Sequence, residues 1–165
     1  MFTGCAQLLP KESSIYERAN SYYQNNTELL DSCVSECMRI FSQNPIGQYQ
    51  LILLESGNMQ LRHEGNGIST KNIKPCDSFV SLFESGLFVR IIFSYNYVEF
   101  HFNTIGNASR MLAYIPENNP IDIYCRNGWI VEGKGGNWSG TVENDDNSIL
   151  ISQIADMYYF IEQHY

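Results

Sequence analysis

The chain has 165 residues, of which 44% are hydrophobic, and this is enough for one globular domain with its own core. Its 18 acidic and 10 basic residues give a formal net charge of −8. This balance disfavours nucleic acid and anionic lipid surfaces as partners, because both attract clusters of Lys and Arg. No apolar run approaches the roughly 18 residues of a membrane-spanning helix. The acidity suits a soluble domain or a basic protein partner.

The first predicted element is an amphipathic helix that begins at a capping box. Ser14 and Glu17 have the spacing at which the hydroxyl and the carboxylate each accept from a free backbone N–H of the first turn. The helical pattern runs to about residue 24 and resumes over about 28–43, where apolar residues recur at intervals of three and four. Polar residues at 25–27 separate the two stretches, so we expect the helix to be broken there.

The middle of the chain is predicted to form an antiparallel sheet of about six to eight short strands. The candidate runs are bounded by turn residues, most clearly by the glycine-rich segment 133–136. These runs are 49–54, 59–63, 79–84, 87–94, 97–103, 111–115, 121–125, 129–132 and 138–142.

Strict alternation at 97–103 gives the clearest strand and the one weak candidate for a catalytic site. Val98 and Phe100 are expected to face the core, whereas Glu99 and His101 share the opposite, wetter face. A carboxylate beside an imidazole can perform acid–base chemistry or hold a metal. The alternative is a solvated face of mixed polar residues. No nucleophile elbow, zinc-protease motif or phosphate loop is present, so no enzyme, metal or cofactor is expected.

The chain is predicted to close with a second helix. Residues 145–148 offer N-cap side chains, and Leu150, Ile154 and Ile161 then follow at helical spacing. The expected fold class is therefore α+β, with an N-terminal helix, an antiparallel sheet and a C-terminal helix. We expect residues 1–12 to be a signal-peptide remnant and tether, and residues 13–165 to be a single domain.

The first residues resemble the lipobox of the bacterial lipoprotein sorting class. Phe2-Thr3-Gly4-Cys5 places small residues before a cysteine, as signal peptidase cleavage requires. The resemblance covers these residues alone and implies that Cys5 is acylated and becomes the N-terminus. The charged and apolar segments of such a signal would have to precede Met1. The implied localisation is a periplasm-facing lipoprotein of the cell envelope, attached to the membrane only through the lipid on Cys5.

The number of cysteines agrees with this resemblance. Five cysteines are an odd number for a secreted protein, and acylation of Cys5 leaves four for two disulfides. We expect Cys33 and Cys37 to pair with Cys76 and Cys125, in an order that the sequence does not determine, because such pairs would close long loops. The alternative is a set of free, buried thiols in a cytosolic protein.

These observations lead to three hypotheses about function. The first is a non-enzymatic, lipid-anchored envelope protein that binds another protein, for example an immunity-type protein. The second is a small-ligand binder or hydrolase that uses the polar sheet face around Glu99 and His101. The third is a cytoplasmic protein of unknown role.

Overall fold

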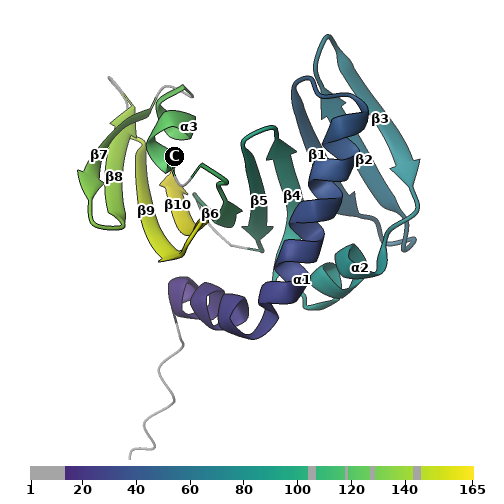
Figure 1. The fold of residues 1–165 in the computed structure, drawn as a ribbon, viewed down its shortest axis with the longest axis horizontal. Helices are drawn as coiled ribbons and strands as arrows, with labels where there is room; N and C mark the ends of the chain where they lie inside the picture. The colour runs from purple at the N-terminus through teal and green to yellow at the C-terminus, as the bar shows by residue number, and fades with distance from the viewer. Residues whose placement is uncertain (1–13, 104–106, 118, 127–128, 143–145) are drawn as a thin grey trace, which may run out of the picture.

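The computed structural model describes residues 14–103, 107–117, 119–126, 129–142 and 146–165 (Figure 1). The helices are α1 (Ile15–Gln43), α2 (Asp77–Glu84) and α3 (Pro120–Arg126). The strands are β1 (Gln48–Leu53), β2 (Met59–Glu64), β3 (Ile68–Ile73), β4 (Phe88–Ser94), β5 (Tyr97–Phe102), β6 (Ala108–Tyr114), β7 (Trp129–Lys134), β8 (Asn137–Val142), β9 (Ser148–Ala155) and β10 (Tyr158–His164).

The described strands form one antiparallel sheet of ten strands, in the order β3-β2-β1-β4-β5-β6-β10-β9-β8-β7. The antiparallel sheet and the α+β character are as the sequence predicted. The predicted arrangement of two terminal helices around six to eight strands is wrong, because the sheet has ten strands and the chain ends in strand β10. Each of these strands pairs with neighbours close in sequence except at β1–β4 and β6–β10, where helices or hairpins intervene.

Helix α1 begins and bends where the sequence predicted. Ser14 Oγ accepts from the Glu17 N–H, and Glu17 accepts in return from the Ser14 N–H at 2.7 Å. Asn26 has non-helical backbone angles inside the helix, and its side chain donates to the Tyr22 carbonyl at 2.9 Å. Side chains that bond the carbonyl four residues back compete with the helical ladder, and three consecutive residues, 25–27, do so here. The bend gives α1 two arms (Figure 1).

One face of the sheet packs under the two arms of α1 and under α2. A row of directly paired residues crosses six strands on this face, and all of them are buried: Leu61, Leu51, Ile91, Phe100, Leu112 and Phe160. The first arm of α1 reaches β10, where the rings of Tyr16 and Phe160 pack edge to face with their centroids 5.5 Å apart. Asp31, which follows the bend, accepts from the Tyr158 hydroxyl at 2.8 Å. The second arm and α2 cover β1, β2 and β4 (Figure 1).

A second core lies on the opposite face, at the other end of the sheet. Side chains alternate between faces along a strand. On β6, Leu112 accordingly joins the first core, whereas Met111 and Ala113 join the second. On β10, Phe160 faces α1, and Tyr159 lies in the second core. The second core is covered by α3 and by the strands from β9 to β7. Strands β6 and β10 are therefore buried on both faces.

The predicted C-terminal helix is a β-hairpin. Strands β9 and β10 pair over their whole length, and Asp156 and Met157 form the turn between them. Met157 has a φ of 62°, a conformation that glycine or asparagine usually supplies in such turns. Because neither residue stands at this position, the sequence gives no local signal for the turn. Apolar residues for both faces of β10 follow one another without alternation. They were therefore mistaken for a helical stripe.

Two of the predicted strands are helices, and one strand was missed. The run 79–84 lies within α2, where Phe79, Leu82 and Phe83 are buried at helical spacing. The run 121–125 lies within α3, which begins at Pro120. Strand β3 was not predicted, because as an exposed edge strand it has a mostly polar sequence. The hairpins at 56–58, 95–96 and 133–136 were predicted correctly.

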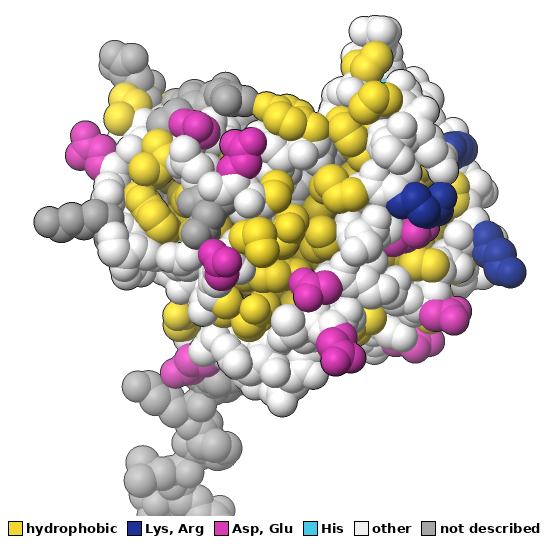
Figure 2. Space-filling view, in the orientation of Figure 1, with side chains coloured by type: hydrophobic (Ala, Val, Ile, Leu, Met, Phe, Trp, Pro, Cys, Tyr) yellow, Lys and Arg dark blue, Asp and Glu magenta, His cyan; other side chains and the backbone are white. Residues whose placement is uncertain are grey.

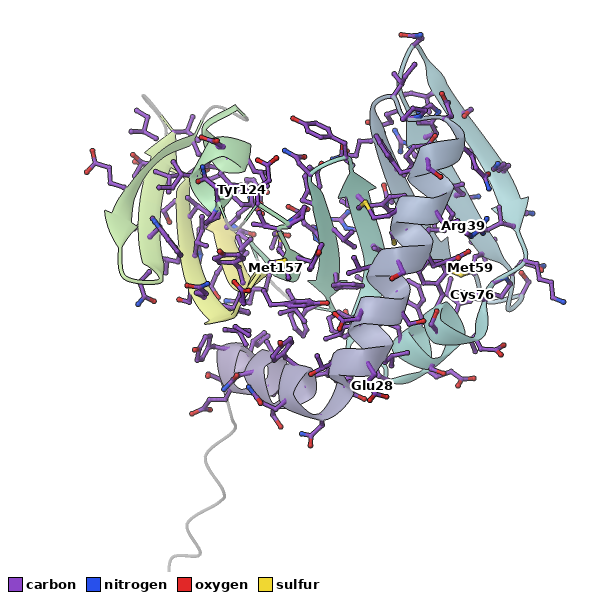
Figure 3. The ribbon with its side chains drawn as sticks, viewed as in Figure 1. Glu28, Arg39, Met59, Cys76, Tyr124 and Met157 are labelled. Atoms are coloured by element: carbon purple, nitrogen blue, oxygen red, sulfur yellow. The ribbon has the colours of Figure 1, made fainter. Side chains whose placement is uncertain are left out.

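Cys33, Cys37 and Cys76 carry free thiols and lie close together where α1 meets the start of α2. Cys76 lies directly before α2 (Figure 3). Cys33 and Cys37 are fully buried. The Cys33 thiol donates to the Ser78 carbonyl at 3.4 Å, and the Cys76 sulfur lies 3.1 Å from the Ser78 hydroxyl. Cys5 and the side chain of Cys125 lie outside the described part of the chain. The full pairing scheme and the acylation of Cys5 therefore stay predictions.

We expect these buried thiols to make the protein sensitive to alkali. Burial raises the pKa of Cys33 from 9.0 to about 12 and that of Cys37 well above 9.0. The raised folded pKa means that the contribution of Cys33 to stability is complete below pH 9 and is lost as pH rises towards 12, because the unfolded chain releases the proton first. Urea unfolding at several pH values should show that Cys33→Ala lessens this loss by about 1.4 kcal/mol per pH unit. Equal slopes for the two proteins would contradict the prediction.

In the part of the chain that the structure describes, no helix has both the length and the apolar character to cross a bilayer. The face that carries α1 has an apolar centre between the two halves of the sheet, with Asp and Glu side chains scattered around it (Figure 2). The Lys and Arg side chains visible on this face lie towards the β1–β3 end (Figure 2). The excess negative charge is thus spread over this surface and does not form one acidic patch.

Candidate functional site

The candidate site lies on β5, at the point where the second face of the sheet changes from open to covered. A row of paired residues crosses this face next to the row under α1: Arg62, Gln50, Ile92, Glu99, Ala113 and Tyr159. Arg62 is exposed and Gln50 is half-buried, whereas Glu99 and Ala113 are buried. The prediction that this face of β5 is exposed to water is therefore wrong. Glu99 is 9% exposed and His101 is 6% exposed.

Three side chains form a buried hydrogen-bonded chain from α3 to β5. The Tyr124 hydroxyl donates to Glu99 Oε1 at 2.8 Å. Glu99 Oε2 lies 3.1 Å from His101 Nε2. Tyr124 is only 2% exposed and projects from α3 beside the sheet (Figure 3). Each oxygen of the carboxylate thus has its own partner, as a buried carboxylate requires.

The other ring nitrogen of His101 faces two groups that can donate a hydrogen bond. Arg90 Nη2 and Ser109 Oγ each lie 3.4 Å from His101 Nδ1. Arginine can only donate, so Nδ1 must accept, and the ring proton belongs on Nε2. In this tautomer Nε2–H donates to the Glu99 carboxylate, and every group in the cluster has a compatible partner. In the cluster Nδ1 thus faces Arg90 and Ser109, and Nε2 faces Glu99.

His101 opens onto a cavity of about 410 Å³ on the side away from Glu99. The walls come from β4, β5, the start of β6 and the C-terminus, and they are both polar and apolar. The described lining residues are Val89, Arg90, His101, Phe102, Asn103, Asn107, Ala108, Ser109 and Tyr165. This volume is near the lower end of the range for small-molecule sites.

The described lining of this cavity carries a basic side chain and no acidic side chain. Although the chain carries a net charge of −8, its described cavity lining contains Arg90 and no acidic residue. No carboxylate among the described residues forms an ion pair with Arg90. The cavity therefore presents the half-buried Arg90 side chain beside hydrogen-bonding groups.

Tyrosine hydroxyls around Glu99 are held in their neutral form. Burial raises the pKa of Tyr97 to about 12 and that of Tyr124 well above its usual value, and the Glu99 charge adds to both effects. The pKa of Tyr165, at the cavity wall, is also raised by burial and by Glu99, while Arg90 opposes the shift. The Tyr124 hydroxyl donates to Glu99 Oε1, and the Tyr165 hydroxyl donates to Gln163 Oε1 at 2.6 Å.

The structure brings Glu99 and His101 together, as their spacing on one strand predicted, but adds partners that the sequence analysis missed. Tyr124 was assigned to a strand, although Pro120 followed by Asp122 is a typical helix start that could have located α3. Arg90 interrupts an apolar strand and pairs directly with His101. Ser109 and Tyr165 had no local signal.

No group of His, Cys, Asp and Glu in the described parts of the chain is arranged to hold a metal ion. Comparison with protein-family models, with curated proteins and with solved structures gives no significant match to this chain. The lipid-anchored, protein-binding hypothesis rests on Cys5, outside the described residues, and stays a prediction.

Proposed function

We propose that the protein binds a small organic anion in the cavity in front of His101. The observation that carries this proposal is the Arg90 guanidinium, without an acidic partner among the described residues, in the wall of a cavity within an otherwise acidic protein. The proposal belongs to the second of the three hypotheses from the sequence.

The arrangement of the walls favours a carboxylate attached to an apolar group. Arg90 offers a planar pair of donors that matches a carboxylate, and the Ser109 hydroxyl lies close by, within reach of the same His101 nitrogen. Val89 and Ala108 supply apolar surface for the rest of the molecule. Burial of Arg90 against the sheet lowers the local dielectric constant and strengthens its attraction for an anion.

Benzoate is a suitable probe, and nuclear magnetic resonance of the ¹⁵N-labelled protein is a suitable measurement. We expect benzoate to shift the backbone signals of Arg90, Ser109 and Tyr165 in a saturable manner. Benzamide, which has the same shape without the charge, should bind at least 10-fold more weakly. The Arg90→Gln variant should lose at least 10-fold in benzoate affinity, which corresponds to about 1.4 kcal/mol.

Arg62→Gln is the matched control. Arg62 lies in β2 on the same face of the sheet but at its open end, where it forms an exposed ion pair with Glu64. This variant should bind benzoate like the unmodified protein. Binding that is unchanged in Arg90→Gln, or equal for benzoate and benzamide, would contradict the proposal.

A further inference from the structure

Ser109, His101 and Glu99 form a hydroxyl–imidazole–carboxylate chain that ends in the cavity. Ser109 Oγ lies 3.4 Å from His101 Nδ1, and His101 Nε2 lies 3.1 Å from Glu99 Oε2. The hydroxyl is half-buried and lines the cavity, whereas the carboxylate lies behind the imidazole and is buried. A serine with an adjacent base, itself oriented by a carboxylate, is the arrangement that activates a hydroxyl as a nucleophile.

We propose that Ser109 is the nucleophile of an esterase reaction, with His101 as general base and Glu99 as its positioning residue. This inference rests on the proposed function, because the anion expected in the cavity is the carboxylate product. The substrate class is a small carboxylic ester whose acyl group lies against Val89 and Ala108.

The reaction has two balanced halves. Ser109 Oγ attacks the ester carbonyl carbon while His101 Nδ1 takes the hydroxyl proton. The carbon–oxygen bond to the leaving group then breaks, and His101 returns the proton to the departing alkoxide. Water next attacks the acylated serine, again losing a proton to His101. The carbon–oxygen bond to Ser109 breaks, and the serine oxygen recovers the proton as the carboxylic acid is released.

Neighbouring groups can stabilise the charge that develops on the carbonyl oxygen. Arg90 Nη2 and Ser109 Oγ are both 3.4 Å from the same ring nitrogen, so the guanidinium lies beside the hydroxyl that attacks. A cationic donor in a cavity with low dielectric constant is suited to an oxyanion. The hydrogen bond between Ser109 and His101 is long, as such bonds often are before a substrate binds.

The test uses diisopropyl fluorophosphate, which phosphorylates an activated serine and releases fluoride and a proton. We expect the intact mass to increase by one diisopropylphosphoryl group, located at Ser109 by peptide mapping. Benzoate should slow this labelling. The turnover of 4-nitrophenyl acetate should fall at least 100-fold in Ser109→Ala, and phosphorylation should be lost.

Ser69→Ala is the matched control, because Ser69 is an exposed strand serine on β3, at the far edge of the sheet. This variant should keep both labelling and turnover. Failure to label Ser109 in a protein that still binds benzoate would overturn the nucleophile while leaving the proposed function intact. If the unmodified protein does not bind benzoate, the proposed function itself is refuted. Labelling at another serine, or turnover unchanged in Ser109→Ala, would also overturn the inference.

Discussion

Replacement of Glu99 by leucine is expected to lower the free energy of unfolding by about 3–4 kcal/mol. Leucine is similar in size to glutamate, so packing changes little. The Tyr124 hydroxyl and the His101 Nε2–H, however, both lose their acceptor in a buried environment. Each orphaned donor costs about 1–3 kcal/mol. Urea unfolding followed by circular dichroism provides the measurement.

Two further variants separate the hydrogen bonds from the packing. Glu99→Gln keeps one acceptor oxygen for one of the two donors, but its amide N–H₂ then faces the other donor. It should lower the free energy of unfolding by about 1–3 kcal/mol, less than Glu99→Leu. Tyr124→Phe removes one donor and should cost about 1–2 kcal/mol. In the Glu99→Leu background, Tyr124→Phe should instead restore about 1–3 kcal/mol, because it removes the hydroxyl that has lost its acceptor. Strict additivity would show that the two side chains are not coupled.

Gly47→Ala is expected to destabilise the protein by about 2–4 kcal/mol. Gly47 has a φ of 76°, and an added Cβ would lie 1.9 Å from the Glu64 carbonyl oxygen. The obstacle is the backbone of Glu64, and Glu64 pairs with Gln48, next to Gly47, at the end of the β1–β2 ladder. The strands must therefore separate or the turn must change. The melting temperature should fall by roughly 5–15 °C.

Gly57→Ala separates the conformational cost from the steric cost. Gly57 has a φ of 77°, almost the same as Gly47, but a Cβ there meets nothing within 4 Å. This variant should lose only about 1 kcal/mol, the cost of a left-handed backbone for a residue with a side chain. Equal losses at the two positions would mean that the contact with Glu64 is relieved by a small local shift.

The elements that the sequence predicted well are those whose signals are local. The capping box at Ser14 and the break at Asn26 arise from hydrogen bonds between residues three or four apart. The turn at 133–136 has glycines with positive φ where the chain reverses. Strand β5 alternates because its residues face two different environments. In each case the side chains that decide the structure lie within a few residues of one another.

The elements that were predicted wrongly depend on contacts from far along the chain. Strand β10 shows no alternation because α1 covers one of its faces and the second core covers the other. Its hairpin turn contains Met157 in place of a typical turn residue. Helix α3 was mistaken for a strand, because a short apolar run has no periodicity that distinguishes the two.

For the candidate site, the sequence by itself determined that Glu99 and His101 share one face of a strand, because side chains alternate along β5. Only the tertiary structure decided that this face is buried. Helix α3 brings Tyr124 against Glu99, pairing with β4 places Arg90 beside His101, and the β5–β6 pairing brings Ser109 to its ring. These partners come from three separate elements, α3, β4 and β6. Their meeting depends on strand order and register, which result from burial of the whole sheet and leave no local pattern in the sequence.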